Sequence, residues 1–290
     1  MSFWQVKNWA RGRELSYVND SDRLWKRLLI AAIEDLSGRL RVLPAYRHWR
    51  RDASASEQQG WQSLLALVGT RLQIDAPAGY HVALRQPVVI IANHPFGIPD
   101  GVALMAVAER IGRPYKILVH SDLMRIPEVA AVGLPVDFSR TKSAAATNLR
   151  TRAAAYDLLQ GGGTVVIFPA GAVATAHRVF GKAQDFAWQP FVGRLIRRSG
   201  AHVLPIYIEG QNSALFQLAS RWSETLRLAL IVSEARRQIA ATIRLRIGPP
   251  VAAAELEGDD RSALRQLYRL VHQLAPDARA PPTLSSDAMR

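Results

Sequence analysis

From about residue 71 onward, short apolar runs alternate with stretches of helical character. We expect strands at 72–75, 88–92, 116–119, 134–137, 164–168, 203–208 and 243–247, with helices between them, notably at 101–111, 143–160 and 188–199. Continuously apolar strands separated by helices are typical of a parallel sheet that is covered on both faces. The sequence therefore predicts an α/β fold with a mostly parallel central sheet flanked by helices.

The first 60 residues differ from the rest because they are basic and amphipathic. Ser21 can cap a helix whose apolar stripe runs from Leu24 to Leu36, with basic residues on the opposite face. Such a segment suits a membrane interface, and a helix that packs on the domain and turns its basic face to solvent fits equally well. We expect three parts: a basic amphipathic helical N-terminal segment at 1–60 as a candidate membrane anchor, an α/β domain at 61–275 and a flexible tail at 276–290.

The charge balance is strongly positive, with 37 Lys and Arg against 24 Asp and Glu and a formal net charge of +13. A chain with this charge is suited to bind nucleic acid, an anionic membrane surface or small acidic carriers. The charge alone does not distinguish among these partners. The absence of cysteine excludes disulfides, zinc–thiolate sites and cysteine nucleophiles. With no long apolar window and no secretory signal at the start, we expect a cytoplasmic protein that can adhere to the inner face of the cell membrane.

A turn-forming segment, N-H-P-F-G-I-P-D-G at 93–101, follows the predicted strand 88–92. Its prolines and glycines disfavour a continuous helix and favour a turn that folds the Asp100 carboxylate back towards the His94 imidazole. Such a pair can act as a general base with its orienting partner. No serine or cysteine in a nucleophile-elbow context accompanies it, so the base would act on a substrate hydroxyl. In the structural alternative, Asp100 caps the following helix and His94 is a hydrogen-bonded turn residue.

Three further sequence blocks bear on the choice between the catalytic and the structural interpretation. They are G-L-P-V-D-F-S-R at 133–140, V-V-I-F-P-A-G at 165–171 and V-L-P-I-Y-I-E-G at 203–210. In this order and at these separations, the chain resembles the lysophospholipid (1-acylglycerol-3-phosphate) acyltransferase superfamily. The closest resemblance is to its hemolysin-like bacterial branch, which is related to ornithine-lipid acyltransferases. The likeness extends over roughly residues 15 to 250 and includes W-Q-P-F-V-G at 188–193.

The resemblance implies a role for each matching residue. His94 would be the general base and Asp100 its orienting partner, and the activated hydroxyl would attack the thioester of an acyl-CoA or acyl carrier protein. It implies no metal and no cofactor besides that co-substrate. Arg140, helped by Lys142, would hold the phosphate or carboxylate of the acceptor, although Arg140 also fits an exposed arginine after a strand. The remaining substrate-binding candidates are Asn93, Phe96, Gly97, Phe168, Pro169 and Gly171, of which the last three also fit an ordinary turn.

The sequence thus predicts a peripheral-membrane O-acyltransferase that acts on a lysolipid, either a lysophospholipid or a lyso-ornithine-type lipid. Ala170 stands where the superfamily has the Glu of F-P-E-G, and Ala172 follows the motif. A catalytically lapsed lipid-binding protein on the same scaffold is therefore the alternative. A nucleic-acid binder ranks last, because no recognisable nucleic-acid-binding motif is present. For the other histidines, including His272, we expect structural or surface roles because they lack metal-ligand spacing.

Overall fold

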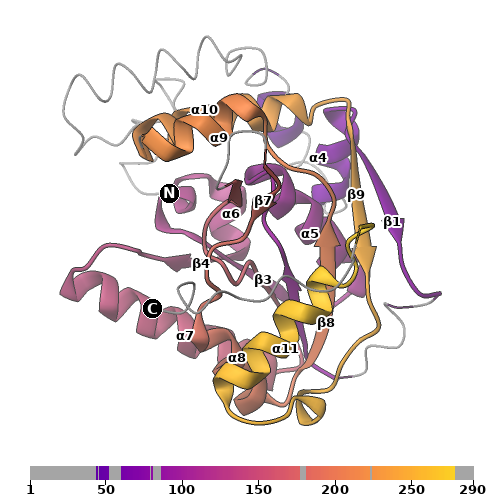
Figure 1. Ribbon diagram of the computed structural model, residues 1–290, viewed down its shortest axis with the longest axis vertical. Coiled ribbons are helices and arrows are strands. Elements are labelled where there is room, and N and C mark those ends of the chain that lie inside the picture. Colours follow the sequence, from indigo (N-terminus) through magenta and orange to yellow (C-terminus); the bar gives the residue numbers. More distant parts are fainter. Residues whose placement is uncertain are drawn as a thin grey trace.

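One mixed sheet organises the computed structural model, which describes residues 44, 46–51, 60–78, 80, 86–176, 181–222 and 224–277. The strand order is β1-β9-β8-β2-β5-β3-β4 (Figure 1). The bounds of these strands are β1 Arg71–Asp75, β2 Val88–Ala92, β3 Tyr115–His120, β4 Gly133–Val136, β5 Thr164–Ile167, β8 His202–Ile208 and β9 Thr242–Ile247. All seven predicted strands are confirmed, and their ends differ from the prediction by no more than about one residue, as expected of strand boundaries.

The sheet is mostly parallel, as predicted. Neighbouring strands are parallel along the order β8, β2, β5, β3 and β4. At the other edge, β9 pairs antiparallel with β8, and β1 pairs parallel with β9. Because β2, β4, β5 and β8 run in one direction, the segments that follow them emerge at the same edge of the sheet. The four sequence motifs therefore converge on one edge, where ligand sites of open α/β sheets usually lie.

The central strand β2 explains why its sequence is continuously apolar. Every residue of Val88–Ala92 is fully buried. Val88, Ile90 and Ala92 belong to the hydrophobic cluster beneath α4 (Trp61–Leu67) and α5 (Ile98–Ile111). Val89 and Ile91 face the opposite cluster, which includes α7 (Lys142–Gln160), α8 (Pro190–Ser199) and α11 (Asp260–His272). Since a strand alternates its side chains between two faces, burial on both sides requires an apolar residue at every position.

Helices form three groups around the sheet (Figure 1). α4 and α5 cover one face, and α7, α8 and α11 cover the other. The helices predicted at 101–111, 143–160 and 188–199 are confirmed as α5, α7 and α8. A third group, α9 and α10, crosses the top of the view. The remaining helical elements have the bounds η1 Ser121–Arg125, α6 Pro127–Val132, α9 Ala214–Trp222, α10 Glu224–Arg237 and η2 Ala253–Glu255.

Two parts of the predicted domain organisation cannot be compared with the fold. The helix predicted from Ser21 to Gly38 lies outside the described residues, as does 278–290 of the predicted tail. Residues 46–51 are helical, and Tyr46 and Trp49 are buried there. Among the helices that the structure describes, none is both long and apolar enough to span a bilayer.

Candidate active site

The turn after β2 brings His94 and Asp100 into contact. Gly97 precedes α5 with a φ of +93°, a backbone conformation that glycine adopts without strain. The helix then begins at Ile98, so Asp100 lies in its first turn. Its Oδ2 atom is 2.9 Å from His94 Nδ1. The predicted return of the carboxylate to the ring is therefore confirmed.

One carboxylate oxygen serves both the helix and the histidine. Asp100 Oδ2 accepts hydrogen bonds from the main-chain N–H groups of Phe96, at 2.8 Å, and Gly97, at 3.0 Å. Asp100 thus caps α5 from inside its first turn, while the side chain itself is fully buried. The structural and catalytic interpretations of Asp100 are compatible. Because a carboxylate only accepts, Nδ1 of His94 is assigned as the donor, which leaves a lone pair on Nε2.

The imidazole of His94 is also held against an aromatic ring. Its centroid lies 3.9 Å from that of Phe168, and the two planes are inclined by 18°. Phe168 directly follows β5, the strand next to β2, so the first and third sequence motifs meet here. The His94 side chain remains 16% exposed. It can therefore reach a substrate while its orientation is fixed by Asp100 and Phe168.

Asn93 and Phe96 make structural contacts on either side of His94. The Asn93 amide donates to the carbonyl of Ile208 at 2.9 Å and accepts from its N–H at 2.7 Å, which joins the ends of β2 and β8. The buried ring of Phe96 lies against Gly210, where an added Cβ would be 2.5 Å from the ring. Substrate binding by Asn93, Phe96 and Gly97 stays a prediction.

The turn after β5 lies against the loop after β4. Gly171, with a φ of +69°, donates its N–H to the carbonyl of Phe168 at 3.0 Å. A Cβ at Gly171 would be 3.1 Å from the Phe138 ring, which is 51% exposed. Pro169 lies within this turn and accepts a hydrogen bond from the N–H of Gln189 at 2.9 Å. The second and third motifs are therefore neighbours.

Arg140 lies in the loop after β4, and Lys142 is the first residue of α7. Both side chains are exposed, and neither forms an ion pair within the part of the chain that the structure describes. Thr141, between them, caps α7 by accepting a hydrogen bond from the N–H of Ala144 at 3.1 Å. Two free cations next to a helix N-terminus favour an anionic ligand.

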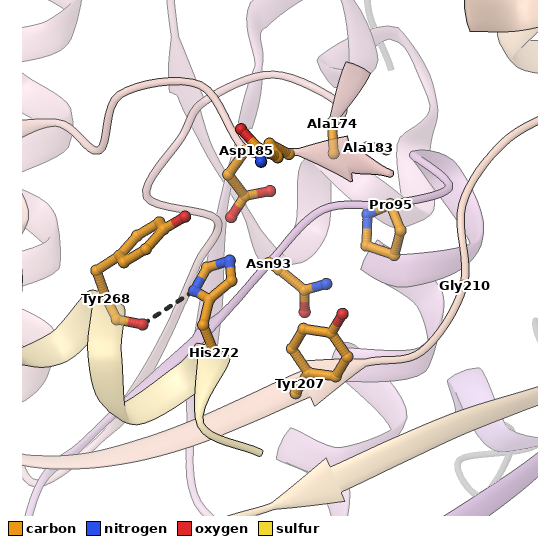
Figure 2. A pocket seen from close by; sticks show the side chains of 10 residues that line it. Asn93, Pro95, Ala174, Ala183, Asp185, Tyr207, Gly210, Tyr268 and His272 are labelled. Carbon is orange, nitrogen blue, oxygen red and sulfur yellow. Dashed lines mark hydrogen bonds between the residues drawn. The ribbon is translucent and has the colours of Figure 1, made fainter. Parts of the chain in front are cut away.

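A small polar pocket lies behind the His94 turn, and the sequence analysis did not identify it. It has a volume of about 40 Å³, room for a few water molecules. Figure 2 shows Asp185, Tyr207, Tyr268 and His272 around it, together with Asn93. The expectation of a structural role for His272 fits its hydrogen bond, in which Nδ1 donates to the carbonyl of Tyr268 at 2.9 Å.

Asp185 connects this pocket to the candidate catalytic residue. Its Oδ1 accepts a hydrogen bond from the main-chain N–H of His94 at 3.1 Å, and its Oδ2 accepts one from Trp188 Nε1 at 3.0 Å. Burial raises the pKa of the Asp185 carboxyl, and nearby His272, the two hydrogen bonds and His94 offset this only in part. The main-chain partner has no sequence signature, which is why the contact escaped prediction.

No group of three or more His, Cys, Asp or Glu side chains that could hold a metal ion occurs among the residues the structure describes. The contacts described above make up a candidate site that consists of a histidine–carboxylate pair, an aromatic wall, two exposed cations and a polar pocket behind it.

Comparisons with known proteins identify the family of the chain. No sequence among the curated proteins matches the chain. Among solved structures, the crystal structure of the 1-acyl-sn-glycerophosphate (LPA) acyltransferase PlsC from Thermotoga maritima is similar, with 13% sequence identity and a TM-score of 0.47 over 96% of this chain and 90% of that chain. A family model described as acyltransferase matches residues 76–274, which is more than half of the chain. The chain therefore belongs to this acyltransferase family.

Proposed function

We propose that this protein transfers a fatty acyl group from the thioester of an acyl-CoA or acyl carrier protein to the hydroxyl group of a lysolipid. Family membership provides acyl transfer as the reaction class. The observation that carries the proposal is the 2.9 Å contact between His94 Nδ1 and the buried carboxylate of Asp100. This contact supports a general base whose second nitrogen is free for substrate.

The reaction can be written with His94 as the only proton carrier. Nε2 removes the proton of the acceptor hydroxyl as the oxygen attacks the thioester carbonyl carbon. The resulting tetrahedral intermediate collapses when the carbon–sulfur bond breaks, and His94 returns the proton to the departing thiolate. Asp100 stabilises the imidazolium that exists between these steps, and its bonds to the main chain hold it in place.

For the acceptor, we propose an anionic head group bound by Arg140 and Lys142. Their loop lies beside the Gly171 turn, and that turn begins at Phe168, which stacks on His94. Ala170, where the superfamily has Glu, is buried and brings no carboxylate to the acceptor. This supports a lysophospholipid or lyso-ornithine-type acceptor of the hemolysin-like branch, held by its phosphate or carboxylate.

We further propose that the enzyme works at the anionic inner face of the cell membrane, where such acceptors reside. Three apolar side chains of α9 are exposed at helical spacing: Leu215 at 63%, Leu218 at 41% and Trp222 at 80%. On the buried side of the same helix, Phe216 clusters with Val173, which lies within 3.3 Å of a Cβ added at Gly97. The exposed stripe is therefore close to the His94 turn, and the net charge of +13 favours anionic lipid.

The primary test is an acyl-transfer assay with purified protein, a panel of lysolipids and both thioester donors. His94→Ala should lower kcat by about 10²- to 10⁴-fold, since it removes the general base. Asp100→Asn should also lower kcat, because the imidazolium loses its counter-charge. His48→Ala, at an exposed histidine on the 46–51 helix, is the control and should retain activity. Activity retained in His94→Ala would overturn the mechanism.

The same panel separates the enzyme from the lipid-binding alternative. A native chain that binds lysolipid vesicles and turns over no acceptor with either donor would refute the proposed activity and support a lapsed enzyme. For the acceptor site, Arg140→Ala should raise KM by about tenfold for anionic lysolipids only, as expected for the loss of a charge-assisted bond. The matched control is Arg150→Ala on α7. The Arg150 side chain donates a hydrogen bond to the carbonyl of Ala146.

A further inference from the structure

His94 is held from outside its own turn as well as from within it. Its imidazole contacts Asp100 and Phe168, and its carbonyl accepts a hydrogen bond from the N–H of Ala174 at 2.7 Å. Its N–H donates to Asp185 Oδ1 at 3.1 Å. Asp185 directly follows β7 (Ala183–Gln184), which pairs with β6 (Thr175–Ala176). The small hairpin that follows the Gly171 turn therefore holds both main-chain groups of His94.

Asp185 is itself held in place. Trp188 Nε1 donates to its Oδ2 at 3.0 Å, and the Trp188 ring packs edge-on against Tyr268 of α11, with centroids 5.2 Å apart. The two carboxylate oxygens thus have different partners: one fixes the turn after β2, and the other fixes the segment before α8. A side chain with two acceptor atoms at these positions is required to satisfy both donors.

The titratable groups that face Asp185 come from three elements. One is His94 after β2. The others, Tyr207 on β8 and Tyr268 and His272 on α11, are shown in Figure 2. Since Nδ1 of His272 donates to a carbonyl, its Nε2 is left for the pocket side. Burial, together with the neighbouring Asp185 and Tyr207, raises the pKa of Tyr268 to about 12, so its phenol stays neutral at physiological pH. Histidine is the group around Asp185 that can supply positive charge.

We propose that Asp185 is a positioning residue for acyl transfer, which fixes the main chain of His94 so that its imidazole stays aligned between Asp100 and Phe168. This inference rests on the proposed function for its effect on turnover. The positions of Asp185 and His94 relative to each other do not depend on the proposed function. A buried carboxylate is costly to keep, and two hydrogen bonds from well-fixed donors offset that cost. Loss of the contact would free the turn, and small displacements of a catalytic group have large effects on rate.

The decisive variant is Asp185→Asn. An amide has a single oxygen, whereas the His94 N–H and Trp188 Nε1–H both need an acceptor, so the amide NH₂ group must face one of these donors. We expect kcat to fall by about 10- to 100-fold, with KM for both substrates changed by less than about threefold. Adding Trp188→Phe removes the second donor and should restore part of kcat. Asp277→Asn, at a carboxylate 75% exposed and paired with Lys182, is the matched control and should leave kcat unchanged.

A second measurement does not depend on activity. The His94 ring protons should be shifted upfield by the stacked Phe168 ring in the native NMR spectrum, and this shift should shrink in Asp185→Asn together with a change in the His94 amide resonance. Unchanged His94 resonances and unchanged kcat would overturn the inference. If the native protein has no acyl-transfer activity, the proposed function fails, and the resonances alone decide the positioning role. If Asp185→Asn does not fold, Trp188→Phe alone replaces it and should give smaller shifts in the same direction.

Discussion

The imidazole of His94 lies flat against the phenyl ring of Phe168, with centroids 3.9 Å apart and planes inclined by 18°. One edge of the imidazole is bonded to Asp100 Oδ2, so the stacking fixes the remaining rotation of the ring. Phe168 begins the turn that also contains the substrate-binding candidates Pro169 and Gly171. This aromatic contact thus joins the candidate base to the turn that contains the candidate substrate-binding residues.

We expect Phe168→Leu to lower kcat by about tenfold, because the imidazole loses its flat support and gains rotational freedom. A steady-state assay with a lysolipid acceptor measures this. Phe191→Leu on α8 is the matched control, since this partly buried ring packs under Arg152 and belongs to the opposite face of the sheet. Equal effects of the two substitutions on kcat would show that the stacking contact has no special role.

We expect Gly210→Ala to lower the free energy of unfolding by about 2–3 kcal/mol, because it combines an unfavourable backbone with a clash. Gly210 has a φ of +114°, and an added Cβ would be 2.5 Å from Phe96 Cζ. Gly200→Ala separates the two effects, since Gly200 has a φ of +68° and no atom within 4 Å of its added Cβ. That control should lose only about 1 kcal/mol in urea denaturation. Equal losses would rule out the clash with Phe96.

The pH dependence of stability should report the buried carboxylate of Asp185. Its pKa is raised in the folded state, mainly by burial, so the folded protein binds the proton more tightly than the unfolded chain. Stability from this group is therefore complete below the unfolded pKa and is lost as the pH rises through the folded pKa.

The measurement is the unfolding free energy of the native protein relative to Asp185→Asn, from about pH 4 to about pH 8. We expect the native protein to lose stability relative to the variant as the pH rises. A difference that stays constant, or that grows in favour of the native protein, would contradict the raised pKa.

Membrane binding should depend on the exposed stripe of α9. We expect Trp222→Ala combined with Leu215→Ser to weaken binding to anionic vesicles by at least about tenfold, since both side chains are largely exposed. Leu149→Ser on α7, where the leucine is 68% exposed, is the matched control and should bind as the native protein does. Vesicle cosedimentation at low and high salt measures the apolar and electrostatic parts separately. If the α9 variant binds anionic vesicles as tightly as the native protein does, α9 does not form the membrane-binding surface.

Much of the fold could be read from local pattern. The apolar run at 88–92 is buried on both faces, so hydrophobicity alone marked it as a central strand. The helix predicted at 143–160 and the strand predicted at 164–168 are separated by three glycines, of which Gly162 has a φ of +79°. The hairpin of β6 and β7 was not predicted, because its two-residue strands carry no periodic signal.

From the sequence alone, the mostly parallel sheet and the candidate residues for chemistry could be predicted, because both depend on local pattern and motif. That the motifs converge on one edge followed once the strand order was known. The return of Asp100 to His94 was also predicted, since a short segment rich in proline and glycine favours a turn. What surrounds that pair is known from the folded structure: the Phe168 ring, the Ile208 main chain and the Asp185 carboxylate. These contacts join distant segments, and two of them involve main-chain groups that every residue possesses. Local sequence therefore carries no record of them.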